Sequence, residues 1–289
     1  SGSAAGISQD ELALIKDKDY TGRVVLRGDN SACPIQVSLV WAEGQAGRQT
    51  VTINKFSKDY KSYDLKFKAG ANTDNARLEI TGSGKGSFVV GTASLMPGDN
   101  VKGFRKDTLD LLKQLDSPLY RWPGGNFVSG YDWRDGLGER DRRPTRSNPA
   151  WTGIETNDVG MHEFIELCRL LDADPMIAIN AGFGDAYSAA DEVEYANGST
   201  DTRMGKWRAA NGSKEAFKVK WWCVGNEMWG DWQLGYMRLN PYVLPHNWVE
   251  EKMRQVEPTS KTVGSGDLGG GWSEVMLRHC AGHMDLISE

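Results

Sequence analysis

The segment WWCVGNEMWG, residues 221–230, ends an apolar run with an amide and a carboxylate, Asn226 and Glu227, among several tryptophans. A carboxyl group that lies against indole rings and apolar side chains keeps its proton more readily than one in water. A glycosidase general acid needs that property, because it must protonate the leaving oxygen near neutral pH. Asn226 can donate and accept hydrogen bonds, which suits a sugar hydroxyl. An ion pair between Glu227 and a loop arginine is the structural alternative.

A second polar group follows another short apolar segment, in the sequence RWPGGNFVSGYDW, residues 121–133. Pro123 and the two glycines favour a sharp turn directly after a strand, and Asn126 then points toward the end of that strand. The same long loop contains Trp133 and Trp151, which favours a binding role over a purely structural turn. Its arginines alternate with Asp135, Glu139 and Asp141, so we predict ion pairs within the loop rather than a phosphate site.

Composition narrows the class of protein. The chain has 289 residues, of which 39% are hydrophobic and 25% charged, so it is long enough for one large α/β domain or two smaller domains. Its net charge of −5, without a basic cluster, argues against nucleic acid and anionic membranes as partners, and no apolar run reaches the ~20 residues of a membrane span. The 11 tryptophans fit either a large aromatic core or stacking on sugar rings.

The cysteines and histidines carry no metal-binding pattern. The four cysteines are far apart and form no CxxC motif, and the four histidines show no ligand spacing. We therefore predict mostly buried, reduced thiols, and neither a metal nor another cofactor. The cysteines are Cys33, Cys168, Cys223 and Cys280.

Two patterns of secondary structure meet near residue 97. Up to that point the hydrophobic period is two and turns are frequent, which predicts an antiparallel sandwich. The expected strands are 22–28, 34–42, 49–55, 61–69, 76–82 and 87–95. A short helix over residues 8–18 is expected to precede them, with Ser8 as its cap and Glu11 three residues later.

After residue 97, helical segments alternate with short apolar strands, which predicts a parallel sheet. Strands are expected at 118–122, 175–182, 218–227, 261–267 and 284–288, with helices at 105–115, 160–171, 189–197, 246–256 and 272–281. Polar residues end or follow these strands, as catalytic groups do in a (β/α)₈ barrel: Asn126, Asn180, Glu227, Asp267 and Glu289. Five strands cannot close such a barrel, so either the sheet is open or the chain is part of a larger protein.

Four long segments, in this order, resemble glycoside hydrolase family 51, whose best-known members are α-L-arabinofuranosidases. They are YRWPGGNFVSGYDWRDGLG, RRPTRSNPAW, ETNDVGMHEFIELCRLL and VKWWCVGNEMWGDWQLG, and the resemblance extends from about residue 95 to the end. It implies that Glu227 is the general acid/base, that Asn226 binds the sugar 2-hydroxyl and that Asn126 contacts the arabinose ring. It also implies that Trp151 lies near the binding subsite, and Trp232 is expected to flank the sugar.

The resemblance further implies a retaining mechanism, with a second glutamate as nucleophile about 5–5.5 Å from the acid/base. Counted from Glu227 as the end of barrel strand four, this chain supplies strands two to six. Strands one, seven and eight, and the nucleophile, are therefore expected in the rest of the parent polypeptide. We predict a fragment with two domains: residues 1–97 form a carbohydrate-binding-like sandwich with a short N-terminal helix, and residues 98–289 form a partial TIM barrel.

The implied activity is release of terminal α-L-arabinofuranosyl groups from arabinoxylan- or arabinan-type hemicellulose, with the isolated fragment inactive. Two alternatives stay open: an endo-acting β-glucanase or xylanase of the same family, and a fragment that only binds carbohydrate. The N-terminal SGSAAG lacks the basic and apolar regions of a signal peptide. The sequence leaves the compartment undecided between bacterial cytoplasm, periplasm and secretion, and it leaves homo-oligomer formation open.

Overall fold

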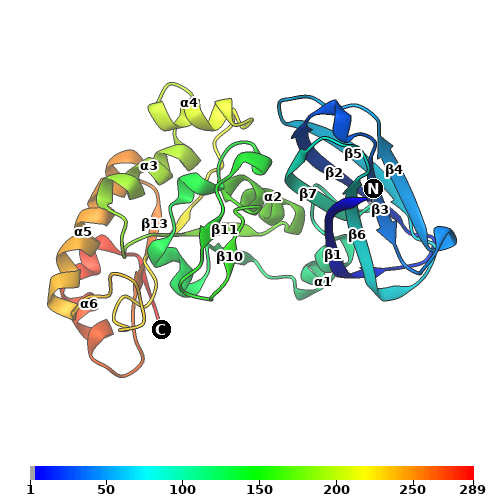
Figure 1. The fold of residues 1–289 in the computed structure, drawn as a ribbon. Helices are drawn as coiled ribbons and strands as arrows, with labels where there is room; N and C mark the ends of the chain where they lie inside the picture. Colours follow the sequence, from blue (N-terminus) through cyan, green and yellow to red (C-terminus); the bar gives the residue numbers. More distant parts are fainter. Residues whose placement is uncertain (1–3) are drawn as a thin grey trace. The chain divides into compact units, whose positions relative to one another are not determined.

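The structure is a computed structural model that describes residues 4–289 and divides into two compact units, Ser1–Leu111 and Leu112–Glu289 (Figure 1). The sequence-based boundary, between residues 97 and 98, lies earlier than this division, which falls inside helix α1 (Lys106–Leu115). None of the helices in the described range is both long and apolar enough to span a bilayer.

The first unit consists of two antiparallel sheets, with strand orders β1-β6-β3-β4 and β5-β2-β7. Alternate residues of both sheets face a shared core that includes Val24, Val37, Leu65 and Ile80, as the period-two pattern requires. The six predicted strands are confirmed. The elements are β1 (Ala5–Leu14), β2 (Asp19–Gly28), η1 (Asn30–Ala32), β3 (Ile35–Val40), η2 (Gln45–Gly47), β4 (Arg48–Ile53), β5 (Lys61–Lys68), β6 (Thr73–Gly82) and β7 (Phe88–Pro97).

The prediction of a helix over residues 8–18 is wrong. Residues Ala5–Leu14 form the edge strand β1, which pairs antiparallel with β6 from Ala5 opposite Gly82 to Leu14 opposite Thr73. The local sequence favours a helix, but ladder hydrogen bonds to β6 outweigh a weak local preference. The register shifts around Leu12, and Glu11, the predicted capping partner, adopts a left-handed φ of 59° there.

The second unit contains a five-stranded parallel sheet, as the alternating pattern predicted. Its order is β14-β13-β12-β11-β8, so the strands follow one another across the sheet in chain order. The strands are β8 (Leu119–Trp122), β11 (Asp174–Ile179), β12 (Trp221–Val224), β13 (Lys261–Ser265) and β14 (Leu286–Ser288). Because all five run parallel, their carboxyl ends lie along one edge of the sheet, and the loops that follow them meet there.

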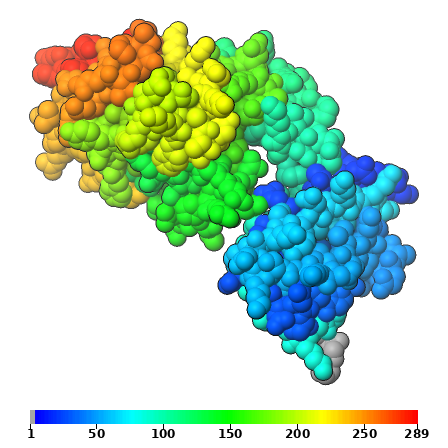
Figure 2. All heavy atoms as spheres, turned by 90° about the horizontal axis from the view of Figure 1, so that it is seen from above, coloured from blue at the N-terminus to red at the C-terminus, as the bar shows by residue number. Residues whose placement is uncertain are grey.

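Helices and short 3₁₀ segments connect these strands, and α4 is the helix that the sequence did not predict. The helices are α1, α2 (Met161–Leu171), α3 (Ala186–Asn197), α4 (Arg203–Ala210), α5 (Leu239–Val256) and α6 (Trp272–Cys280). The loop after β8 contains η3 (Gly125–Gly130), η4 (Trp133–Gly136), η5 (Arg140–Arg142) and the two-residue strands β9 (Arg146–Ser147) and β10 (Ile154–Glu155); η6 (Ala281–His283) precedes β14. Helix α5 packs against α3 and α6, and the three segments adjoin in the space-filling view (Figure 2).

The two faces of the parallel sheet differ. Trp222 and Val224 of β12 belong to the large core that the helices cover, whereas Trp221 and Cys223 lie in a smaller apolar cluster on the opposite face. This alternation holds β12 from both sides, and it fixes the position of the residues that follow the strand.

The prediction of buried thiols is confirmed for three of the four cysteines. Cys168, Cys223 and Cys280 are buried, Cys33 is half-buried, and all four are free. Burial raises the pKa of Cys168 and of Cys280 to about 11, so both stay protonated at neutral pH. These two thiols therefore serve as small apolar side chains in the core.

Candidate active site

Two of the strand-end loops meet through their asparagines. The Nδ2 atom of Asn226, after β12, donates to Oδ1 of Asn126, after β8, over 3.2 Å. Arg121 in β8 donates from Nη2 to Oδ1 of Asn226 over 3.0 Å. Asn126 and Asn226, singled out separately in the sequence, thus lie in one hydrogen-bonded group at the carboxyl edge of the sheet.

Glu227 stands between two buried neighbours. Asn226 is 7% exposed and Met228 is fully buried, while the Glu227 side chain itself is exposed. Its backbone adopts a left-handed φ of 44°, a conformation that costs a non-glycine residue energy and is concentrated at functional sites. Gly230 N–H donates to the Glu227 carbonyl over 2.8 Å and closes this turn.

The carboxylate environment differs from the sequence-based expectation of an enclosure by indole rings. One indole reaches it: Trp232 donates from Nε1 to Oε2 of Glu227 over 3.3 Å, while the rest of the side chain faces solvent. The alternative of an ion pair with a loop arginine is not found among the described residues. Glu227 is therefore accessible to a ligand, with one oxygen oriented by Trp232.

Trp232 is held by its neighbours although it is itself 55% exposed. Its ring meets that of Trp229 edge to face at 5.1 Å, and Trp229 is anchored because its Nε1 donates to the carbonyl of Gly266 over 2.9 Å. A Cβ atom at Gly230 would lie 2.5 Å from the Trp232 ring, so this close approach requires glycine.

Trp151 lies over the turn that precedes Asn126. Oδ1 of Asn148 accepts hydrogen bonds from the backbone N–H groups of Ala150 and Trp151, over 3.1 and 3.0 Å. The Trp151 ring lies 3.1 Å from the position of a Cβ at Gly125, yet the side chain is 61% exposed. The loop thus presents an exposed aromatic surface beside Asn126. Trp133, which the sequence grouped with Trp151, is a buried core residue.

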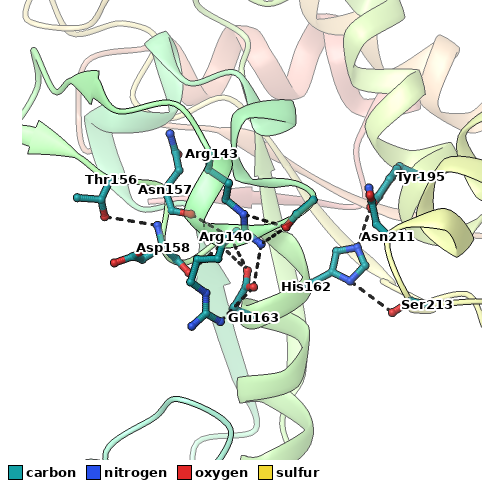
Figure 3. Close-up of polar contacts among 12 residues, drawn as sticks. Arg140, Arg143, Thr156, Asn157, Asp158, His162, Glu163, Tyr195, Asn211 and Ser213 are labelled. Atoms are coloured by element: carbon teal, nitrogen blue, oxygen red, sulfur yellow. Dashed lines mark hydrogen bonds and ion pairs between the residues drawn. The ribbon is translucent and has the colours of Figure 1, made fainter. Parts of the chain in front are cut away.

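Ion pairs connect residues of the arginine-rich loop that carries Trp151. Arg146 contacts Asp135 over 2.7 Å, and Arg142 contacts Glu139 over 2.9 Å, which confirms the predicted pairing within the loop. Arg143 instead reaches helix α2 and donates from Nη1 and Nη2 to the two carboxylate oxygens of Glu163, over 2.9 Å each (Figure 3). This bidentate pair ties the loop to the helical layer.

We expect Glu163→Gln to destabilise the protein in a pH-dependent way. Burial raises the pKa of Glu163, but the hydrogen bonds from Arg143 and from Gly160 N–H outweigh burial and leave the pKa below its ordinary value. The pair therefore stabilises the fold above the unfolded-state pKa of about 4.3, and this contribution is lost as the pH falls through the lower folded-state value. At pH 7 the variant should lose about 1–3 kcal/mol of unfolding free energy.

Chemical denaturation of the full-length protein at pH 7 and below pH 4 tests this expectation. Glu139→Gln is the matched control, because Glu139 pairs with Arg142 at an exposed position where removal of the charge changes little. The difference between wild type and Glu163→Gln should shrink at low pH. A difference that stays constant across this range would contradict the role given to the charge.

Other polar residues at strand ends have structural partners. Oδ1 of Asn180 accepts from the N–H groups of the three residues 182–184, and its Nδ2 donates to the carbonyl of Tyr131 over 3.0 Å. Asp267 exchanges hydrogen bonds with Ser273 at the start of α6. Both residues shape loops, and this separates them from Glu227, whose carboxylate is exposed. Within the described residues, no cluster of three or more potential metal ligands occurs.

Sequence reasoning missed three members of the polar group: Arg121, Ser129 and Gln233. The amide of Gln233 donates to Asn126 and accepts from Ser129, and both Ser129 and Gln233 are buried. Arg121 could have been found from the sequence, because it is the one charged residue in the apolar strand Leu119–Trp122. Ser129 and Gln233 could not have been found in this way, because their partners lie about a hundred residues away in the chain.

Comparison with known proteins places the sheet and its loops in a family. The family model described as "Alpha-L-arabinofuranosidase 1 domain" matches residues 111–278, which include β8 to β13, most of α6 and every residue of the polar group. A probable α-L-arabinofuranosidase C from Aspergillus clavatus is 40% identical over 186 residues. An intracellular exo-α-(1→5)-L-arabinofuranosidase from Bifidobacterium longum is 38% identical over 198 residues.

The solved structures agree with these relatives. The α-L-arabinofuranosidase from Thermotoga maritima, determined with arabinose, superposes with a TM-score of 0.63 at 40% identity, over 65% of this chain and 39% of that one. The match to the A. clavatus protein covers 64% of this chain and 37% of that protein. The match to the B. longum protein covers 66% of this chain and 35% of that protein. The chain belongs to the α-L-arabinofuranosidases of glycoside hydrolase family 51.

Proposed function

We propose that the full-length protein is a retaining α-L-arabinofuranosidase in which Glu227 is the general acid/base. The observation that carries the proposal is the position of Glu227: exposed, three residues beyond the end of the largely buried parallel strand β12, between two buried residues, with one carboxylate oxygen held by Trp232. Family membership supports the reaction class, and the carboxyl edge of such a sheet is where catalytic groups occur.

The proposal includes a barrel and a binding module. Five parallel strands in chain order, with helices on one face, fit part of a (β/α)₈ barrel. We infer that the rest of the parent polypeptide supplies the remaining strands and the glutamate nucleophile. The antiparallel sandwich of the first unit fits a carbohydrate-binding module, the role given to it in this proposal.

The reaction proceeds in two steps. The nucleophile attacks the anomeric carbon as Glu227 gives its proton to the departing glycosidic oxygen, so the carbon–oxygen bond breaks and an arabinosyl-enzyme ester forms. Glu227, now a carboxylate, takes a proton from water, whose oxygen attacks the same carbon and releases the nucleophile. Arabinose leaves with its anomeric configuration retained, and Glu227 is again protonated.

The surrounding side chains bind the sugar in this proposal. Asn226 and Asn126 offer amide groups to its hydroxyls, since both lie at the carboxyl edge within one hydrogen-bonded group. Trp151 and Trp232, both more than half exposed, offer aromatic faces to its apolar side. The substrate class is an arabinose-containing oligosaccharide or polysaccharide, in line with the names of the relatives.

Product analysis with the full-length protein tests this function. Incubation with arabinoxylan and linear α-(1→5)-arabinan should release free arabinose, whereas carboxymethylcellulose and unsubstituted xylan should stay intact. Nuclear magnetic resonance of the first product should show the α-anomer. Shortened glucan or xylan chains without free arabinose would overturn the assignment and support the endo-acting alternative.

A further inference from the structure

Gln233 lies in the loop between β12 and α5, six residues after Glu227, and its side chain is buried, with 3% exposed. Both the nitrogen and the oxygen of its side-chain amide form hydrogen bonds within the protein. Nε2 donates to Oδ1 of Asn126 over 2.5 Å, and Oε1 accepts from the hydroxyl of Ser129, itself fully buried, over 2.7 Å. A buried amide that satisfies both its oxygen and its nitrogen side has a defined orientation.

The hydrogen bonds of this group run in one direction. Arg121 has no acceptor atom, so its contact requires Oδ1 of Asn226 to face it and leaves Nδ2 of Asn226 to donate to Asn126. Oδ1 of Asn126 therefore receives two donors, Asn226 and Gln233, which occupy both lone pairs. Nδ2 of Asn126 has no hydrogen-bond partner in residues 4–289.

We propose that Gln233 is a positioning residue for the glycosidase reaction, which holds the Asn126 amide so that its N–H₂ group donates to the sugar. The inference rests on the proposed function and deepens it. It specifies that the sugar atom opposite Asn126 accepts a hydrogen bond, as a hydroxyl or ring oxygen does. Since Gln233, Glu227 and Trp232 share one loop, the contact also links the acid/base loop to the loop of Asn126.

Replacing Gln233 with glutamate tests the direction of the contact without changing the shape of the side chain. A protonated glutamate still donates to Oδ1 of Asn126. An ionised one only accepts, so Asn126 must rotate and turn its oxygen toward the sugar. In the full-length protein we expect kcat/KM on an aryl α-L-arabinofuranoside to fall about 10- to 100-fold at neutral pH, the effect of one mispaired buried hydrogen bond.

The pH dependence separates positioning from a merely structural role. A glutamate ionises above a pKa of about 4.3, which burial raises, so Gln233→Glu should regain activity relative to wild type as the pH falls. Gln233→Met fills the site without any donor, and its loss should be the same at every pH. The charged groups of this region are the same in wild type and in both variants: Arg121, Glu227 and Asp231. Their effect therefore cancels when kcat/KM of a variant is divided by kcat/KM of wild type at the same pH.

Several outcomes would overturn the inference. The inference is wrong if Gln233→Glu has wild-type activity at neutral pH. It is also wrong if the pH profiles of Gln233→Glu and Gln233→Met are parallel. Unfolding midpoints establish that each variant is folded. Where Gln233→Glu does not fold, Ser129→Ala removes the donor that orients Gln233 and should weaken L-arabinose binding, measured by calorimetry; unchanged affinity would count against the inference.

The proposed function is tested by different results from those that test the role of Gln233. If the wild-type protein does not hydrolyse the aryl arabinofuranoside, or if Glu227→Ala is fully active, then the assignment of the reaction is wrong. If the wild type is active and Glu227→Ala is impaired, but every Gln233 variant behaves like wild type, then only the positioning role of Gln233 is wrong.

Discussion

Glu227→Ala in the full-length protein should lower kcat/KM on arabino-oligosaccharides by about 10²- to 10⁴-fold, the usual contribution of a general acid. A sugar alkoxide is a poor leaving group, so its departure depends on the proton that Glu227 supplies. A 2,4-dinitrophenolate leaves without protonation, and kcat/KM on the corresponding arabinofuranoside should change little. The second step still lacks its base, so the arabinosyl-enzyme should accumulate, and added azide should restore turnover by forming an arabinosyl azide.

Steady-state kinetics on the two substrates, with and without azide, make this prediction specific to an acid/base. Glu289→Ala is the matched control, because Glu289 also follows a strand of the sheet but has no role in the proposed reaction. It should show no dependence on the leaving group. Equal losses on both substrates after substitution of Glu227 would indicate a residue that binds the sugar rather than one that transfers a proton.

The sequence predicted the parallel sheet and the residues at its edge for a physical reason. An apolar segment such as residues 221–224 must be covered on both faces, and a polar pair directly after it must lie at the carboxyl end of the strand. Asn126 and Asn226 could therefore be placed at one edge before their hydrogen bond was known. The antiparallel strands of the first unit were predictable from period-two alternation in the same way.

The remaining features depend on contacts between distant residues. Gln233 has an ordinary loop sequence around it, and its importance arises from Asn126 and Ser129, which belong to another loop. Residues 5–14 form a strand because β6 pairs with them, although their own sequence favours a helix. The open position of Glu227 likewise follows from the turn at φ 44° and from Gly230, and no pattern of nearby tryptophans could specify it.

Trp222→Ala should have the largest effect on stability. Trp222 is fully buried in β12, where its Nε1 donates to the carbonyl of Val219 over 3.2 Å. Alanine removes most of the side chain and leaves a cavity that close-packed neighbours cannot fill, at a cost of about 3–5 kcal/mol. Amide hydrogen exchange in β11 and β12 of the full-length protein measures this local free energy without assuming that all domains unfold together.

Trp232→Ala is the control, since it deletes the same side chain from the loop after the same strand. Trp232 is 55% exposed and is not a member of the buried core, so protection of β12 should stay nearly unchanged. Its loss should instead lower activity, because the indole orients the Glu227 carboxylate and, in the proposed function, offers its face to the sugar. The expected result is that Trp232→Ala loses activity but keeps its protection from amide hydrogen exchange, whereas Trp222→Ala loses that protection. This result would show that the strand positions the site and that the loop after it binds the sugar. Equal loss of protection in the two variants would show that the loop and the strand form one cooperative unit, in which Gln233 and Asn126 could not be varied without disturbing the sheet.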